Sequence, residues 1–258
     1  MKISLAVITF NEQHNIVPLL TNVCDIFDQI VIVDGGSPDK TIKLIEDYRK
    51  DTESDKIKLR IQPQNGPRYS KAWKQSAQRN IALDECTGDW VFTMDADERL
   101  DVNARIQLEK LVLEKKPSCI AWAMPTRHYW ETPDQIRCDK HWWPNYHYRF
   151  WQNGLNIRYS PHYRHCYPMI PQYPDVRKQL DEMESAPYSG VIIHHYHHCP
   201  VKKLGFVYRA NFKDVRDVNQ LEKGLKKKRV KPREKTEKEK QWERERLLQE
   251  SQDKTAHI

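Results

Sequence analysis

Apolar and polar positions alternate in blocks over the first hundred residues. Short apolar runs bounded by turn-forming residues, the pattern of buried strands, occur at 3–9, 29–33, 57–61 and 90–94. Between them apolar positions recur at helical spacing, first at Ile16, Leu19, Leu20 and Val23. Regular alternation of strands and helices is typical of βαβ units. We therefore predict an α/β fold, a Rossmann-like and mostly parallel sheet flanked by helices.

The pattern changes beyond residue 101. A helix to about residue 114 and a strand near residues 119–124 are predicted next. Residues 128–187 are rich in aromatic residues, His and Pro, and they show no clear period. Residues 191–193 predict one more buried strand, which is followed by the run His194-His195-Tyr196-His197-His198.

Charge divides the chain into two parts. Residues 222–258 hold 13 Lys and Arg against 8 Asp and Glu, while the whole chain has a formal net charge of +7. We therefore predict a nearly neutral catalytic domain over residues 1–221 and a charged helical tail over residues 222–258. The tail is either a solvated helix or an electrostatic contact with nucleic acid or an anionic surface, because clustered Lys and Arg bind phosphates.

Composition excludes several protein classes. With 38% hydrophobic residues in a chain of 258, a sizeable core can form and general disorder is excluded. No apolar run approaches the roughly 20 residues of a membrane-spanning helix. The six cysteines include no Cys-x-x-Cys pair, which favours reduced thiols over a disulfide scaffold or zinc ribbon. We expect a cytoplasmic protein, with peripheral contact to the inner membrane surface as an alternative.

Polar side chains follow three of the predicted strands. They lie in the segments Thr9-Phe10-Asn11-Glu12, Asp34-Gly35-Gly36-Ser37 and Asp95-Ala96-Asp97-Glu98-Arg99. Ligands of doubly wound sheets bind outside the carboxyl ends of the strands, so these segments should meet at one edge. Gly35 and Gly36 permit close backbone approach, and Asp34 can accept hydrogen bonds from a base or ribose. The pattern predicts a nucleotide site.

Asp95 and Asp97 form an Asp-x-Asp pair after a buried strand. Hard carboxylate oxygens are suited to Mg²⁺ or Mn²⁺, and such an ion can bridge to a diphosphate. The alternative is a surface turn or a helix cap, because Asp-x-Asp is common in both.

Five segments, in this order, resemble the inverting glycosyltransferases of family 2, which have the GT-A fold. They are ISLAVITFNE (3–12), IVIVDGGSPDKT (30–41), QRNIAL (78–83), TGDW (87–90) and DADERL (95–100). The last segment is similar to the subgroup that includes lipopolysaccharide-core glucosyltransferases. The resemblance is loose in the second half of the chain.

The resemblance implies roles for individual residues. The residues implied to bind the donor nucleotide, a UDP-sugar in our expectation, are Thr9, Asn11, Glu12, Asp34, Arg79 and Asp95. Those implied to bind Mn²⁺ or Mg²⁺ are Asp95 and Asp97, with a histidine from a later strand end, either His194 or His195. The alternative for the histidines is a polar loop whose rings pack on their neighbours.

The catalytic base and the acceptor site are less well defined. Inverting transfer needs a base to take the proton of the acceptor hydroxyl. The subgroup often has a His-Glu pair after an Arg-hydrophobic-Phe strand, and this chain has Arg149-Phe150-Trp151 but no glutamate near His165. The candidates are Asp139, Glu131, Asp134 and His165. We expect Trp142 and Trp143 to form an acceptor wall, because adjacent side chains of an extended backbone point to opposite sides.

Three functions fit these features. The first is metal-dependent transfer of a sugar, with inversion, to an acceptor glycan, a lipid-linked glycan or modified DNA. The second is nucleotidyl transfer, which the lack of a Gly-rich phosphate loop with Lys counts against. The third is nucleic-acid binding by the tail of an inert transferase-like body, which the intact Asp34, Asp95 and Asp97 count against.

Overall fold

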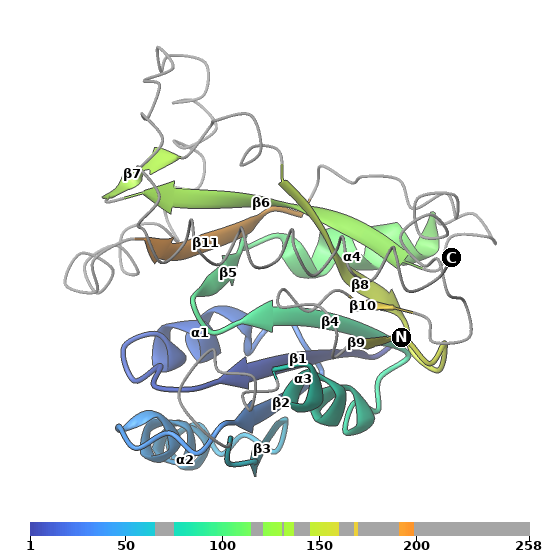
Figure 1. The fold of residues 1–258 in the computed structure, drawn as a ribbon. Coiled ribbons are helices and arrows are strands. Elements are labelled where there is room, and N and C mark those ends of the chain that lie inside the picture. Colours follow the sequence, from blue (N-terminus) through green and yellow to red (C-terminus); the bar gives the residue numbers. More distant parts are fainter. Residues whose placement is uncertain are drawn as a thin grey trace, which may run out of the picture. The chain divides into compact units, whose positions relative to one another are not determined.

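A computed structural model describes residues 1–64, 75–114, 121–130, 132–136, 145–159, 168–169 and 191–198. The first elements are β1 (Ile3–Thr9), α1 (Ile16–Val23), β2 (Gln29–Asp34), α2 (Thr41–Asp51), β3 (Ile57–Ile61), α3 (Gln75–Asp84), β4 (Trp90–Asp95), β5 (Glu98–Leu100) and α4 (Ala104–Leu113). The later described elements are the strands β6 (Ala121–Trp130), β7 (Thr132–Ile136), β8 (Asn145–Gln152), β9 (Arg158–Tyr159), β10 (Pro168–Met169) and β11 (Ile193–His198) (Figure 1).

Nine of the strands form one mixed sheet. Its order is β3-β2-β1-β4-β8-β6-β11-β5, and β7 pairs with β6. Strands β1 to β4 are mutually parallel, which confirms the predicted βαβ alternation. Beyond β4 the sheet becomes mixed, because β8 is antiparallel to both β4 and β6, and β5 is antiparallel to β11. The predicted α/β class, with helices flanking a large sheet, is confirmed.

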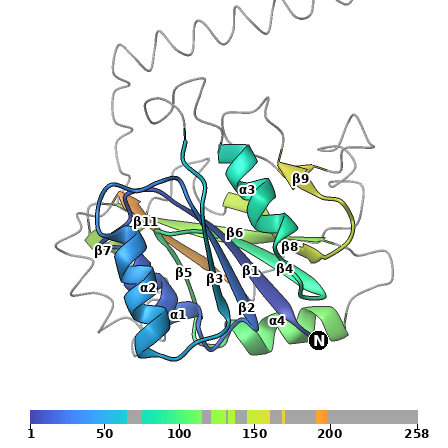
Figure 2. The ribbon, with the colours of Figure 1, turned by 90° about the horizontal axis from the view of Figure 1, so that it is seen from below.

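Helices cover both faces of the parallel half of the sheet (Figure 2). One core cluster joins Ile3, Leu5 and Val7 of β1 to apolar side chains of α1, α2 and α4. A second cluster joins Ala6 of β1 and Val31 of β2 to α3. Successive side chains of a strand point to opposite faces, so β1 contributes to both clusters. This explains why residues 3–9 are mostly apolar and buried.

An aromatic cluster joins the parallel half of the sheet to the mixed half. Phe150 of β8 is fully buried, and its ring centroid lies 5.2 Å from that of Trp90 and 5.4 Å from that of Trp122. Phe92 lies 6.0 Å from Phe150 on the β4 side. Three strands, β4, β8 and β6, therefore share one packed layer of rings.

Two later elements differ from the sequence prediction. β6 is longer than the predicted strand near residues 119–124. The predicted strand 191–193 begins instead at Ile193 and continues through the His run, because β11 pairs with β6 on one side and with β5 on the other. No helix among the described residues is long and apolar enough to cross a membrane.

Replacing Phe150 by Ala should destabilise the fold strongly, because it removes the ring at the centre of the aromatic cluster. We expect the free energy of unfolding to fall by about 3–5 kcal/mol, measured by urea denaturation. Tyr146 on the same strand is 42% exposed, and Tyr146→Ala should change stability by no more than about 0.5 kcal/mol. Equal effects of the two substitutions would contradict this account of the core.

Candidate active site

The three polar segments of the sequence meet at the carboxyl edge of the parallel strands. Thr9 at the end of β1 pairs with Asp34 at the end of β2, and Ile8 pairs with Asp95 at the end of β4. The segments are far apart in sequence, and β1 brings them together because it lies between β2 and β4.

Asp34 organises the loop that follows β2. Its side chain is fully buried, and its carboxylate accepts hydrogen bonds from Thr9 Oγ1 (2.7 Å), Gly36 N (2.8 Å), Ser37 N (2.7 Å) and Ser37 Oγ (2.7 Å). Gly36 has φ +82°, a backbone conformation that favours glycine. Two carboxylate oxygens offer about four acceptor positions, so these four donors use them fully. Asp34 holds the loop in shape in this structure.

The loop leaves a tight space beside Gly35. A Cβ added there would lie 3.0 Å from Phe10 Cδ2 and 3.1 Å from Gln78 Nε2. Gln78 is 1% exposed, and its Nε2 has no hydrogen-bond partner in the part of the chain that the structure describes. The sequence motif contained Gln78, but no role was predicted for it. A buried amide donor therefore lies beside Gly35.

Asn11 and Glu12 tie the end of β1 to the start of α2. The backbone N–H of Asn11 donates to Ser37 Oγ at 2.9 Å, and that of Glu12 donates to Thr41 Oγ1 at 2.8 Å. Asn11 has φ +58° and is exposed, so its side chain lies at the open side of the loop. The two residues thus brace the Asp34 loop from the β1 side.

Two arginines from distant elements bind the carboxylates that follow β4. Arg79 of α3 contacts Asp95 at 2.5 Å, and Arg149 of β8 contacts Glu98 at 2.7 Å and Asp95 at 3.9 Å. The guanidinium of Arg79 also lies over the ring of Tyr159, 5.2 Å from its centroid. The arginines therefore connect α3, β8 and β9 to the same turn.

The environment moves the pKa values of Asp95 and Glu98 in opposite directions. Burial acts to raise the pKa of Asp95, but the charges of Arg79 and Arg149 outweigh it and lower that pKa. Burial raises the pKa of Glu98, although Arg149 acts against it. Glu98 also accepts a hydrogen bond from the backbone N–H of Asp95 at 2.8 Å. Its role is to hold the turn, so it is not a free acid or base.

Asp97 and His195 lie side by side across the turn. His195 Nε2 is 3.5 Å from Asp97 Oδ2, and the backbone N–H of Tyr196 donates to the carbonyl of Asp97 at 3.0 Å. Burial acts to lower the pKa of His195, but Asp97 outweighs it, with Glu98 and Asp95 adding to the effect, and raises that pKa to about 9. In the absence of other ligands the pair is a carboxylate and an imidazolium.

His194 points to the opposite face of β11. Its Nδ1 lies 2.8 Å from the hydroxyl of Tyr129, and its Nε2 lies 2.9 Å from Asp101 Oδ1. Alternation along the strand separates His194 from His195. Of the two histidines that the sequence proposed for the site, His195 is the one beside Asp97.

Asp97 and His195 supply donors that suit a divalent cation. Among the residues that the structure describes, no group of three His, Cys, Asp or Glu is arranged to hold a metal ion. Mg²⁺ in nucleotide sites is commonly held by one or two carboxylates, with substrate phosphates and water completing its coordination. One carboxylate and one imidazole with partly exposed side chains therefore fit such an ion, while Asp95 is engaged by Arg79.

Several predicted site residues lie outside the described residues. These are the base candidates Glu131, Asp139 and His165, the acceptor wall Trp142 and Trp143, and the tail 222–258. Conversely, sequence reasoning gave no role to Gln78, Glu98, Arg149 or His128. Glu98 and Arg149 stood within noted motifs, and the signal that could have linked them is their opposite charge.

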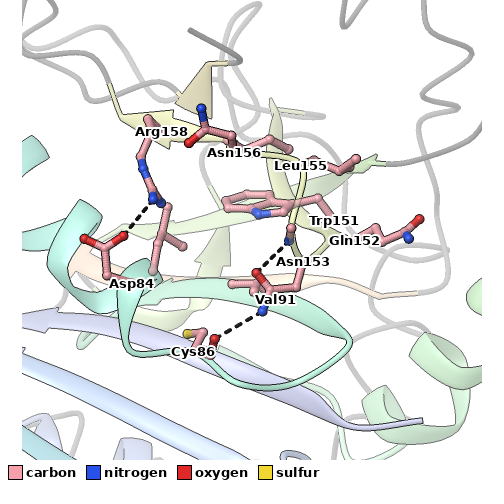
Figure 3. Close-up of a pocket in the computed structure, with 12 residues that line it drawn as sticks. Asp84, Cys86, Val91, Trp151, Gln152, Asn153, Leu155, Asn156 and Arg158 are labelled. Atoms are coloured by element: carbon pink, nitrogen blue, oxygen red, sulfur yellow. Dashed lines mark hydrogen bonds and ion pairs between the residues drawn. The ribbon is translucent and has the colours of Figure 1, made fainter.

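A separate pocket of about 290 Å³ lies between the end of α3, the start of β4 and the β8–β9 loop (Figure 3). Arg158 and Asp84 form an ion pair of 2.7 Å there. Asn153 donates to the carbonyls of Cys86 (3.1 Å) and Gly88 (2.8 Å). Burial raises the pKa of Cys86 to about 12, so this thiol is not a nucleophile at neutral pH. The pocket adjoins the amino end of β4, opposite to Asp95.

Comparison with known proteins relates the same region to one family. Residues 4–166 match the family model described as Glycosyl transferase family 2. The lipopolysaccharide core biosynthesis glycosyltransferase LpsC of Rhizobium meliloti (strain 1021) is 33% identical over 113 residues, which are 42% of this chain and 38% of LpsC. The match thus spans little more than a third of that relative. β11, with His195, lies beyond the family match.

Two solved structures show weaker similarity. S. aureus TarS 1-349 in complex with UDP-GlcNAc has 18% sequence identity and a TM-score of 0.41, covering 62% of this chain and 49% of that one. The mannosyltransferase PcManGT from Pyrobaculum calidifontis, in complex with GDP-Man and Mn²⁺, has 17% identity and a TM-score of 0.48, covering 86% and 64%.

Arg149→Met should destabilise the protein by about 3–5 kcal/mol at neutral pH, because it leaves Glu98 buried without its cation. Since the change raises the pKa of Glu98 further, the folded state gains a proton as pH falls, and the loss should shrink towards acid pH. Urea denaturation at several pH values measures this. Adding Glu98→Gln should restore most of the stability, and a double variant as unstable as Arg149→Met alone would contradict the pairing.

Proposed function

The chain belongs to glycosyltransferase family 2, and on that premise we propose that it transfers a sugar from a nucleoside diphosphate sugar to an acceptor hydroxyl. We include inversion at the anomeric carbon and dependence on a divalent cation in the proposal. The observation that carries it is the meeting of the Asp34 loop, Asp95 and the Asp97–His195 pair at one sheet edge. The family match gives no support to the nucleotidyl-transfer and nucleic-acid-binding alternatives.

The nucleoside would bind over the ends of β1 and β2. The narrow space at Gly35 and the unpartnered amide of Gln78 support this, because a base carbonyl there would satisfy a buried donor. Thr9, Asn11 and Glu12 shape the wall of the same loop. A uracil base, and so a UDP-sugar, fits an amide donor of this kind.

The diphosphate would lie towards the end of β4. Arg79 and Arg149 provide fixed positive charge on one side. Asp97 and His195 would hold Mn²⁺ or Mg²⁺, which supplies charge stabilisation to the departing diphosphate. His195 must give up its Nε2 proton to serve as a ligand, because only a neutral imidazole nitrogen binds a metal.

The acceptor would approach from the side of the aromatic middle region. Glu131, Asp134, Asp139 and His165 stay our candidates for the base, and Trp142 and Trp143 for the acceptor wall. Similarity to LpsC favours a saccharide acceptor, either a free glycan or a lipid-linked one. A hydroxyl of modified DNA is the third acceptor class, and its binding would depend on the basic residues of the tail.

Asp97→Asn should abolish donor turnover. Purified protein incubated with a panel of UDP- and GDP-sugars and Mn²⁺ should release the nucleoside diphosphate, and the substitution should lower this rate by at least about a hundredfold. Exposed Asp55 offers a matched control, since Asp55→Asn removes the same charge just before the amino end of β3, away from the carboxyl ends of the strands. Release of pyrophosphate would indicate nucleotidyl transfer, and no turnover of any donor would contradict the proposal.

His195→Ala and His194→Ala should have different effects, because the two side chains face opposite sides of β11. We expect His195→Ala to weaken Mn²⁺ binding by about tenfold or more. Calorimetry measures this binding. His194→Ala should leave Mn²⁺ affinity nearly unchanged and instead lower stability by about 1–3 kcal/mol, since Tyr129 loses its buried partner. If both substitutions weakened Mn²⁺ binding equally, the assignment of His195 rather than His194 to the metal site would be wrong.

A further inference from the structure

His128 and His195 form a close pair of imidazoles behind the Asp97 carboxylate. The two residues are directly opposite each other in the parallel β6–β11 pairing. Their Nδ1 atoms lie 2.7 Å apart, and the rings meet edge to face with centroids 4.8 Å apart. His128 is 5% exposed, so bulk water does not compete freely for this contact.

The contact requires one proton between the two nitrogens. Two bare nitrogens at this distance would repel each other through their lone pairs, and two N–H groups would clash. One Nδ1 is therefore a donor and the other an acceptor, although the distance alone does not say which.

With a metal ion beside Asp97, as in the metal-free imidazolium, His195 Nδ1 is the donor of this hydrogen bond. His195 points Nε2 towards Asp97, so Nε2 is the nitrogen that would bind the ion. A neutral imidazole carries one hydrogen, so with Nε2 engaged its hydrogen must be on Nδ1. His195 Nδ1 then donates, and His128 Nδ1 accepts.

We propose that His128 is a positioning residue that holds His195 in the tautomer whose Nε2 is available to a divalent cation at Asp97. This inference rests on the metal site of the proposed function. Histidine ligands generally give their second N–H to an acceptor outside the coordination sphere, which fixes the ring and its tautomer. Here the acceptor is another imidazole.

The neutral acceptor suits the charge of this site. Asp95, Asp97 and Glu98 already bring three carboxylates, which repel one another, into one turn. A further carboxylate behind His195 would add to that repulsion. An imidazole satisfies the Nδ1–H of His195 and adds no negative charge.

Two substitutions of His128, nearly equal in size, distinguish a positioning role of this residue from a role in packing alone. His128→Asn keeps an acceptor, because its Oδ1 can take the place of Nδ1, whereas His128→Leu has a similar shape and no acceptor. Binding of Mn²⁺ alone to the full chain is measured by electron paramagnetic resonance of the free ion. We expect His128→Leu to weaken binding by about 10–100-fold and His128→Asn to weaken it clearly less. Equal affinities of the two variants would overturn the proposal.

Ring ¹⁵N–¹H spectra give a readout that needs no activity. In wild-type protein with Mg²⁺, His195 should carry its proton on Nδ1, and Nδ1 of His128 should be unprotonated. The reverse pattern would overturn the proposal, and this measurement decides the matter even if His128→Leu fails to fold.

A further variant distinguishes an error in the proposed metal site from an error in the proposed role of His128. Asp97→Asn should lose Mn²⁺ binding whatever His128 does. If Asp97→Asn binds Mn²⁺ as wild type does, the proposed metal site is wrong and the role of His128 falls with it. If Asp97→Asn loses binding while His128→Leu keeps it, the metal site stands and only the positioning role is overturned.

Discussion

The candidate site depends on how the chain compensates three carboxylates in one short turn. Asp95, Asp97 and Glu98 lie within four residues, and each has a cationic partner from another element. The partners are Arg79 from α3, Arg149 from β8 and His195 from β11. Glu98 is buried, and Asp95 and Asp97 are partly buried, so each cationic partner lowers the free-energy cost of bringing the three carboxylates together. The turn and its three acids are therefore held by α3, β8 and β11 together.

Because their partners differ, the three acids also have different roles. Glu98 is 1% exposed and binds Arg149 and the backbone N–H of Asp95, so it is part of the scaffold. Asp95 remains ionised under the charge of Arg79. Asp97 alone is paired with a group that can exchange its proton for a metal ion. Three residues of one type thus have different chemical roles, which the letters DADE do not distinguish.

The local pattern of apolar and polar residues was sufficient to predict the strands that are buried on both faces and joined by short connections. The runs at residues 3–9, 29–33 and 90–94 are buried strands, and the polar segments after them meet at one edge. It was insufficient for β11, whose His run looks polar and loop-like. That strand exists because β6 and β5 pair with it and because the successive residues His194 and His195 find partners on opposite faces. Such long-range pairing leaves no period in the sequence.

The same reasoning explains why Gln78, Arg149 and His128 carried no signal of their own. Arg149 and His128 contact residues of distant strands, and Gln78 lies beside the Gly35 loop. Only the folded sheet brings these residues together. Asp34 illustrates the converse, since the loop sequence Asp-Gly-Gly-Ser indicated a ligand-facing carboxylate. Its oxygens are instead occupied by Thr9, Gly36 and Ser37. A carboxylate bound by its own loop keeps the backbone in a fixed shape, which lowers the entropy that a ligand must remove on binding. In the nucleotide site that we propose, Asp34 would therefore contribute by fixing the shape of the space at Gly35, where an added Cβ would lie only 3.0 Å from Phe10 Cδ2.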